Sequence, residues 1–172
     1  MWLRAVPLTS DQARSRKFAL QVRVVDGRGD QTGDAEGWRK RQIVAIQLNH
    51  TIVPADDAKA SATWLSEILG RGAPTRFGPF WAVALDNGAT LDFQDSHEAI
   101  PVEHYAFLVS EGEFDAIFER IRARGLSYWA DPMHRRPFEI NHNDGGRGLY
   151  WNDPNGHYLE IITRPYGSRE TS

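Results

Sequence analysis

The sequence contains no cysteine. This absence excludes disulfide bonds, thiolate metal ligands and a cysteine nucleophile, and it agrees with a reducing compartment. No apolar run approaches the roughly 18–20 residues that span a bilayer. The N-terminus also lacks the apolar segment of a secretory signal peptide. We therefore expect a cytoplasmic protein without a membrane partner.

Net charge is also small. The 172 residues include 20 Lys or Arg and 23 Asp or Glu, which gives a net charge of −3. A chain of this charge has no overall electrostatic reason to bind nucleic acid. Hydrophobic residues make up 41% and charged residues 25% of the chain, as is ordinary for a globular protein that buries a core.

The first 42 residues differ in composition from the rest. They hold nine Lys or Arg and five Asp or Glu, a net charge of +4, whereas residues 43–172 have a net charge of −7. Asp26–Gly37 is polar and contains glycine, as loops do. Phe18–Val25 alternates enough to be a short strand. We predict that residues 1–42 form an extension outside the main fold, or alternatively a basic arm that packs on a partner subunit.

From Ile43 onward, strand and helix patterns follow each other twice. In the first half, Pro54 is expected to end the first strand, and Asp56 or Asp57 is expected to cap the helix. The first half is predicted to contain a strand at Ile43–Val53, a helix to about Leu69, and strands Phe80–Leu85 and Thr90–Phe93 around an Asp-Asn-Gly turn. The second half is predicted to contain strand Val102–Val109, helix Glu111–Arg124, and strands Leu149–Trp151 and His157–Thr163 around an Asp-Pro-Asn-Gly turn.

The two halves align as an internal repeat. His50 lies 20 residues before Gly70, and His104 lies 21 residues before Gly125. Each histidine therefore belongs to the strand that precedes a helix.

The far ends of the two halves align as well. Turn glycines Gly88 and Gly156 correspond, which sets Asp92 against Glu160. A polar side chain in an otherwise apolar strand costs several kcal/mol unless it finds a partner. A shared Fe(II), Mn(II), Zn(II), Ni(II) or Co(II) ion would be such a partner for two imidazoles and one or two carboxylates. A single such His is more often a satisfied core residue, and Asp92 has the alternative of facing solvent on an edge strand.

At these residues the sequence resembles the vicinal oxygen chelate superfamily, which includes glyoxalase I, fosfomycin-resistance thiol transferases, bleomycin-binding proteins and extradiol dioxygenases. The resemblance covers residues 43–165, with modules 43–96 and 101–165, and leaves 166–172 as a C-terminal tail. It implies an α+β fold in which paired βαβββ modules form a cupped mixed β-sheet with helices outside, usually in a homodimer. It implies a metal ion on His50, His104 and Glu160, with Asp92 as a fourth ligand or base.

A longer pattern resembles the extradiol dioxygenases more specifically. His142 is followed by Leu149-Tyr150, then by the Asp153–Gly156 turn, and then by Glu160. The resemblance implies that His142 and Tyr150 contact the substrate hydroxyl or bound oxygen.

In one respect the sequence departs from the extradiol pattern. Extradiol enzymes use another His before the second metal ligand as acid or base, and the nearest candidate, His97, lies only seven residues before His104. Asp95, Glu98 or a different residue could take the place of this acid or base histidine, or the chemistry is not ring cleavage. Aromatic pocket walls are expected from Tyr105, Trp151 and Tyr158, and also from Trp81 and Phe93.

Three functions are compatible with these residues. The favoured hypothesis is a non-haem Fe(II) dioxygenase of extradiol type that acts on a small catecholic or vicinal-oxygen substrate. The second is a glyoxalase-like lyase or isomerase, or a thiol transferase, that uses Zn, Ni or Mn, with Asp92 or Glu160 moving a proton. The third is a non-catalytic small-molecule binding protein that confers resistance.

Overall fold

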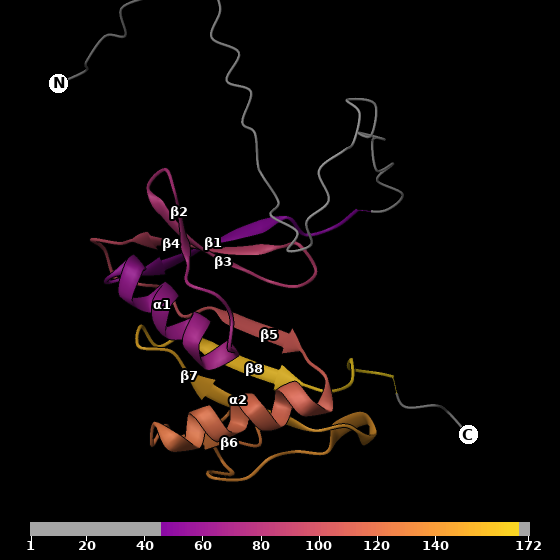
Figure 1. The fold of residues 1–172 in the computed structure, drawn as a ribbon. Coiled ribbons are helices and arrows are strands. Elements are labelled where there is room, and N and C mark those ends of the chain that lie inside the picture. Colours follow the sequence, from indigo (N-terminus) through magenta and orange to yellow (C-terminus); the bar gives the residue numbers. More distant parts are fainter. Residues whose placement is uncertain (1–45, 169–172) are drawn as a thin grey trace, which may run out of the picture. The chain divides into compact units, whose positions relative to one another are not determined.

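The computed structural model describes residues 46–168 (Figure 1). The chain divides into the units Met1–Val44 and Ala45–Ser172, and the described residues all belong to the second unit. The predicted extension 1–42 and its strand at Phe18–Val25 lie outside the described residues. Across 46–168, the helices are too short or too polar to cross a membrane.

Each half of the repeat forms its own four-stranded mixed sheet with one α-helix. In the first module the elements are β1 (His50–Ala55), α1 (Ala58–Leu69), β2 (Thr75–Phe77), β3 (Phe80–Ala84) and β4 (Thr90–Asp95), in the sheet order β1-β4-β3-β2. In the second they are β5 (His104–Leu108), α2 (Glu111–Ala123), β6 (Tyr128–Trp129), β7 (Gly148–Asn152) and β8 (Tyr158–Ile162), in the order β5-β8-β7-β6, with a short 3-10 helix η1 (Asn143–Gly145) before β7. In both sheets the strand before the helix pairs in parallel with the last strand. The predicted α+β fold of paired βαβββ modules is confirmed.

Local sequence signals account for both helices. The Asp57 side chain accepts the backbone N–H of Ala60 at 2.8 Å, and Gly70 ends α1 with φ of 68°, a conformation that glycine adopts without strain. In α2, Ser110 and Glu113 form a reciprocal capping box. Caps of this kind satisfy backbone groups that the helix itself leaves unpaired, so both helices begin where the sequence predicts.

The prediction that Pro54 ends the first strand is wrong, because β1 runs from His50 to Ala55. Strand β1 lies at the edge of its sheet, and Ala55 provides the ladder contact by accepting the Ser96 N–H at 2.8 Å. The Pro54 carbonyl turns away from the ladder and accepts from the His157 ring at 2.9 Å. A proline that faces away from the ladder costs no hydrogen bond.

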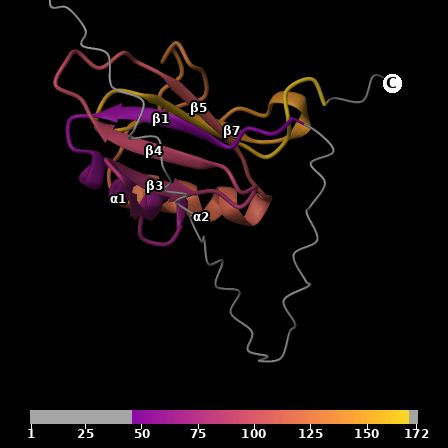
Figure 2. The ribbon, with the colours of Figure 1, turned by 90° about the horizontal axis from the view of Figure 1, so that it is seen from above.

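One core joins the two modules. It includes Leu65 and Ile68 from α1 and Phe114 and Ile121 from α2, all almost completely buried. Figure 2 shows α1 and α2 beside each other on one side of the strands. Each side chain of this size contributes about 1.5–3 kcal/mol when it leaves water. The helix-facing side of each sheet is therefore the core side, and the opposite face carries polar side chains such as Asp92 and Glu160 together with exposed apolar ones.

The turn before β8 also ties the modules together. The fully buried His157 ring accepts the Glu103 N–H at 3.1 Å and donates to the Pro54 carbonyl of the first module. Asn155 accepts the Asp56 N–H at 3.0 Å and donates to Ser61 at 3.0 Å. A segment predicted only as a turn thus fixes the second module against the start of α1.

Candidate metal centre

A buried carboxylate lies on the face of the second sheet that points away from the core. Glu160 is level with Ala106 on β5 and with Tyr150 on β7, and its side chain is fully buried. His104 begins β5 and stands beside Tyr158 in the register. We call the side of the second sheet that carries His104, Tyr150, Tyr158 and Glu160 the Glu160 face.

The His104 ring is oriented for metal binding. Its Nδ1 lies 3.0 Å from the Tyr158 carbonyl oxygen, and its Nε2 lies 3.2 Å from Glu160 Oε2. Because a carbonyl only accepts, the hydrogen of a neutral His104 ring is on Nδ1 and the lone pair of Nε2 faces the carboxylate. A backbone carbonyl holds many metal-ligating histidines in this tautomer.

Glu160 Oε2 fits the same interpretation. This buried oxygen has no hydrogen-bond partner among the described residues. A lone pair and a carboxylate oxygen repel each other unless a cation or a proton lies between them. Two donor atoms that each lie about 2.1 Å from one ion are about 3.0 Å apart in octahedral and about 3.4 Å apart in tetrahedral coordination. The pair therefore has the chemistry and the spacing of two neighbouring metal ligands.

The other Glu160 oxygen belongs to a hydrogen-bond chain of tyrosines. Tyr166 donates its hydroxyl hydrogen to Oε1, and the Tyr150 and Tyr166 hydroxyl oxygens are 2.6 Å apart. Burial, followed by the contact with Glu160, raises the pKa of both tyrosines, so both remain protonated donors. The Tyr150 ring also stacks against His104, with centroids 6.1 Å apart.

Sequence analysis missed Tyr166 because it placed residues 166–172 in a tail. Tyr166 lies beyond the last strand of the repeat, where nothing in the other module corresponds to it. A tyrosine shortly after Glu160 was the only available signal.

The other two predicted ligands lie on the first sheet. His50 opens β1, is exposed, and its Nδ1 lies 2.8 Å from the Asn49 side-chain oxygen. Asp92 on β4 is 7% exposed, and its buried Oδ1 has no hydrogen-bond partner within residues 46–168. No three His, Asp or Glu side chains of these residues converge enough to hold an ion. One chain thus brings His104 and Glu160 together, and the roles of His50 and Asp92 stay predictions.

The predicted acid or base residues are spread over both modules. His142 immediately precedes η1, is exposed and makes no side-chain capping bond there. His97 follows β4 and borders a shallow cleft of about 330 Å³ beside β1. Asp95 instead accepts the Ala58 N–H at 2.7 Å and so helps to cap α1.

Several residues predicted as pocket walls belong to the core. Trp151 is fully buried, Phe93 is 2% exposed, and Tyr105 packs against the same cluster. Tyr105 and Trp151 both pair with Leu159, so they point away from Glu160. Successive residues of a strand face opposite sides of the sheet, so these side chains do not line the Glu160 face.

A different aromatic group lines that face. Tyr158 lies 5.2 Å from the His134 ring, and His134 stacks on Trp129 with centroids 3.8 Å apart and an angle of 12° between the planes. Trp129 is paired with Tyr150 across β6 and β7, which places it in the same row as Glu160. His134 has a positive φ of 58°, a strained conformation for this residue. Sequence analysis predicted Tyr158 but missed Trp129 and His134.

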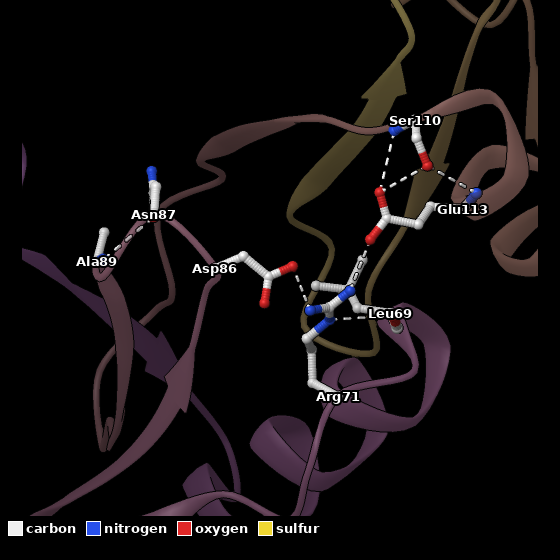
Figure 3. Close-up of polar contacts among 7 residues, drawn as sticks. All are labelled: Leu69, Arg71, Asp86, Asn87, Ala89, Ser110 and Glu113. Atoms are coloured by element: carbon white, nitrogen blue, oxygen red, sulfur yellow. Dashed lines mark hydrogen bonds and ion pairs between the residues drawn. The ribbon is translucent and has the colours of Figure 1, made fainter. Parts of the chain in front are cut away.

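A second cleft, of about 550 Å³, lies where the two modules meet. Its polar feature is Arg71, which pairs with Asp86 and, at 2.9 Å, with Glu113 (Figure 3). Hydrogen bonds from Ser110 lower the pKa of Glu113, so this carboxylate stays charged at neutral pH. The cleft contains none of the predicted site residues. Arg71, Asp86 and Glu113 come from both modules, so we assign these ion pairs to the contact between the modules. Ion pairs this exposed contribute about 1 kcal/mol or less.

Comparison with known proteins identifies the family. The model of the Glyoxalase/Bleomycin resistance protein/Dioxygenase superfamily matches residues 47–161. The chain belongs to this superfamily, and the resemblance to the vicinal oxygen chelate proteins is confirmed. Members of the superfamily are generally metal-dependent, bind small molecules and form dimers.

Individual relatives include enzymes of two kinds. The chain is 62% identical to a solved structure of Oxidase ChaP-H1, with a TM-score of 0.71, over 72% of this chain and 99% of that one. Oxidase ChaP-H2 is 64% identical, with a TM-score of 0.71, over 72% and 98% of the two chains. Glutathione transferase FosA from Serratia marcescens is 26% identical over 120 residues, which are 66% of this chain and 78% of the relative.

Proposed function

We propose that the protein is a metal-dependent oxidase that uses dioxygen on a small substrate with two neighbouring oxygen atoms. The observation that carries this proposal is the His104–Glu160 pair, in which an imidazole lone pair faces a buried, unpartnered carboxylate oxygen. The similarity of the chain to two proteins named oxidases, at 62% and 64% identity, supports the oxidase class. Fe(II) is the favoured metal, because one carboxylate with two imidazoles suits non-haem iron.

The ligands would be Nε2 of His104, Oε2 of Glu160 and the His50 ring of a second copy. Within one chain, His50 is on the first sheet and the other two are on the second. Both sheets expose apolar side chains on the same faces as these ligands, Ile52 beside His50 and Leu108 on the Glu160 face. A homodimer that covers these faces would complete the ligand set. Once bound, the ion would lower the pKa of a substrate hydroxyl and hold the substrate near dioxygen.

The protein side chains would bind and orient the substrate. The aromatic rings of Trp129, His134 and Tyr158 offer flat surfaces on which an aromatic or otherwise planar substrate could stack. His142 would deliver a proton to the substrate as a general acid. Tyr150 would orient the substrate by accepting a hydrogen bond from its hydroxyl, because the hydrogen of Tyr150 is donated to Tyr166.

Thiol transfer is the second candidate function. It is favoured by the 26% identity to a glutathione transferase of the same superfamily. In that case the same ligands would hold Mn, Zn or Ni, and the buried Asp92 would handle the proton of the thiol.

Oxygen uptake distinguishes these functions. The protein is purified anaerobically, loaded with Fe(II) and mixed with a panel of aromatic compounds that carry adjacent hydroxyl or keto oxygens. We expect substrate-dependent oxygen consumption that a chelator abolishes. If no panel member is oxidised and glutathione is conjugated with Mn(II) instead, the oxidase proposal is wrong. If chelation leaves small-molecule binding unchanged, the protein is a binding module.

A His142→Gln substitution tests the proton donor. We expect kcat to fall by about 10² to 10⁴, the range for loss of a general acid, while iron content stays the same. The matched variant His97→Gln tests the competing histidine in the same assay. A fall in kcat for His97→Gln alone would transfer the role to His97, and loss of iron from His142→Gln would show that His142 has been misassigned.

A further inference from the structure

Tyr166 reaches Glu160 because the chain turns back after β8. Pro165 precedes it, and Gly167 follows with a positive φ of 73°, which glycine adopts without strain. The Pro165 carbonyl accepts the Ser168 N–H at 3.2 Å and closes the turn. The Tyr166 residue is 55% exposed, yet its hydroxyl touches a fully buried carboxylate.

The direction of the hydrogen bonds follows from counting hydrogens. A tyrosine hydroxyl has one hydrogen to donate. Tyr166 donates its hydrogen to Glu160 Oε1, so the 2.6 Å contact between the two hydroxyls has Tyr150 as donor and Tyr166 as acceptor. The chain runs from Tyr150 to Tyr166 to Glu160.

This chain leaves the two carboxylate oxygens in different states. Oε1 is held by a hydroxyl, whereas Oε2 has no hydrogen-bond partner in the described structure and lies 3.2 Å from His104 Nε2. The Tyr166 bond therefore fixes the rotation of the carboxyl group and presents one oxygen to the position beside His104.

We propose that Tyr166 is a positioning residue for the metal site and makes Glu160 a ligand through one oxygen only. This inference rests on the proposed function, because it assumes that His104 and Glu160 hold an ion. Without the Tyr166 hydroxyl, the carboxyl group is free to rotate and to offer both oxygens. Groups that bond to metal ligands in this way change metal affinity by 10- to 100-fold when they are removed.

Packing does not account for the position of Tyr166. A residue that is 55% exposed buries less than half of its surface, so its ring adds less to folding stability than a core aromatic residue does. Its notable contact is the polar one with Glu160. Removing the hydroxyl leaves buried Oε1 without its donor and should lower the stability of the metal-free protein. The effect on metal affinity is therefore measured separately from the effect on folding.

The test is the affinity of the full chain for Zn(II) and Co(II), measured by competition with a chelator. We expect Tyr166→Phe to weaken both affinities by about 10- to 100-fold and to change the visible absorption spectrum of bound Co(II). The thermal midpoint of the metal-free protein should fall, because buried Glu160 Oε1 loses its donor, so the affinities are measured well below the unfolding transition. A chain that ends at Pro165 should show the same loss of affinity.

Tyr105→Phe is the matched control, because it removes a tyrosine hydroxyl that donates to another glutamate of the second module, Glu103, and leaves Tyr166 and Glu160 unchanged. Its loss of affinity should be clearly smaller than that of Tyr166→Phe. Unchanged affinity and spectrum in Tyr166→Phe, or an equal loss in Tyr105→Phe, would overturn the role of Tyr166 but not the metal site. A wild-type protein that binds neither ion would overturn the metal site and this inference together.

Discussion

Replacing Glu160 with Gln should abolish metal binding and at the same time stabilise the metal-free protein. Glu160 is fully buried, and Oε2 faces the lone pair of His104 without a hydrogen-bond partner within residues 46–168. An amide nitrogen at that position donates to His104 Nε2 and removes a buried charge. A buried unsatisfied group costs about 1 to 3 kcal/mol, so the gain in unfolding free energy should be of that order.

Metal analysis checks the loss of metal binding, and denaturant unfolding of the metal-free protein checks the gain in stability. Glu103→Gln is the control, because Glu103, immediately before β5, is a second carboxylate that accepts a tyrosine hydroxyl, from Tyr105. That variant should keep its metal and gain no stability. A Glu160→Gln protein that retains the ion, or that is less stable without it, would contradict the assignment of Glu160.

Two inactive variants should restore activity to each other if the site is shared between copies. In a mixed dimer of His50→Ala and Glu160→Gln chains, one site contains His104 and Glu160 of the first chain and His50 of the second. Random pairing of equal amounts in a twofold dimer should recover about a quarter of wild-type oxygen uptake. The subunits are mixed by co-expression and the activity is measured after metal loading.

The control mixture combines His104→Ala with Glu160→Gln. His104 and Glu160 of each site come from the same chain, so each chain damages the site to which it supplies them. Both sites of every dimer are then inactive, and no activity should return. Recovery in the control, or no recovery with His50→Ala, would show that the sites are not shared as proposed.

Local patterns predicted the fold well because caps and alternation act over a few residues. Asp57 was one of two predicted caps of the first helix, and it is the one that caps α1. The error at Pro54 arose because the position of a strand at the edge of a sheet depends on tertiary structure. Strands β2 and β6 were missed because three- and two-residue strands have no detectable periodicity.

The site was only partly predictable from the sequence. The repeat identified His104 and Glu160, and the structure places them 3.2 Å apart. Strand alternation alone could have excluded Tyr105, since it directly follows His104 on β5 and so faces the other side. Tyr166 has no counterpart in the repeat, and no local pattern could show that it returns to Glu160.

The most direct test of the metal centre is anomalous diffraction from crystals grown anaerobically with Fe(II). We predict one ion per chain that touches Nε2 of His104, Oε2 of Glu160 and the ring of His50 from a second copy. Absence of an ion beside His104 and Glu160 in a protein that binds iron in solution would contradict it.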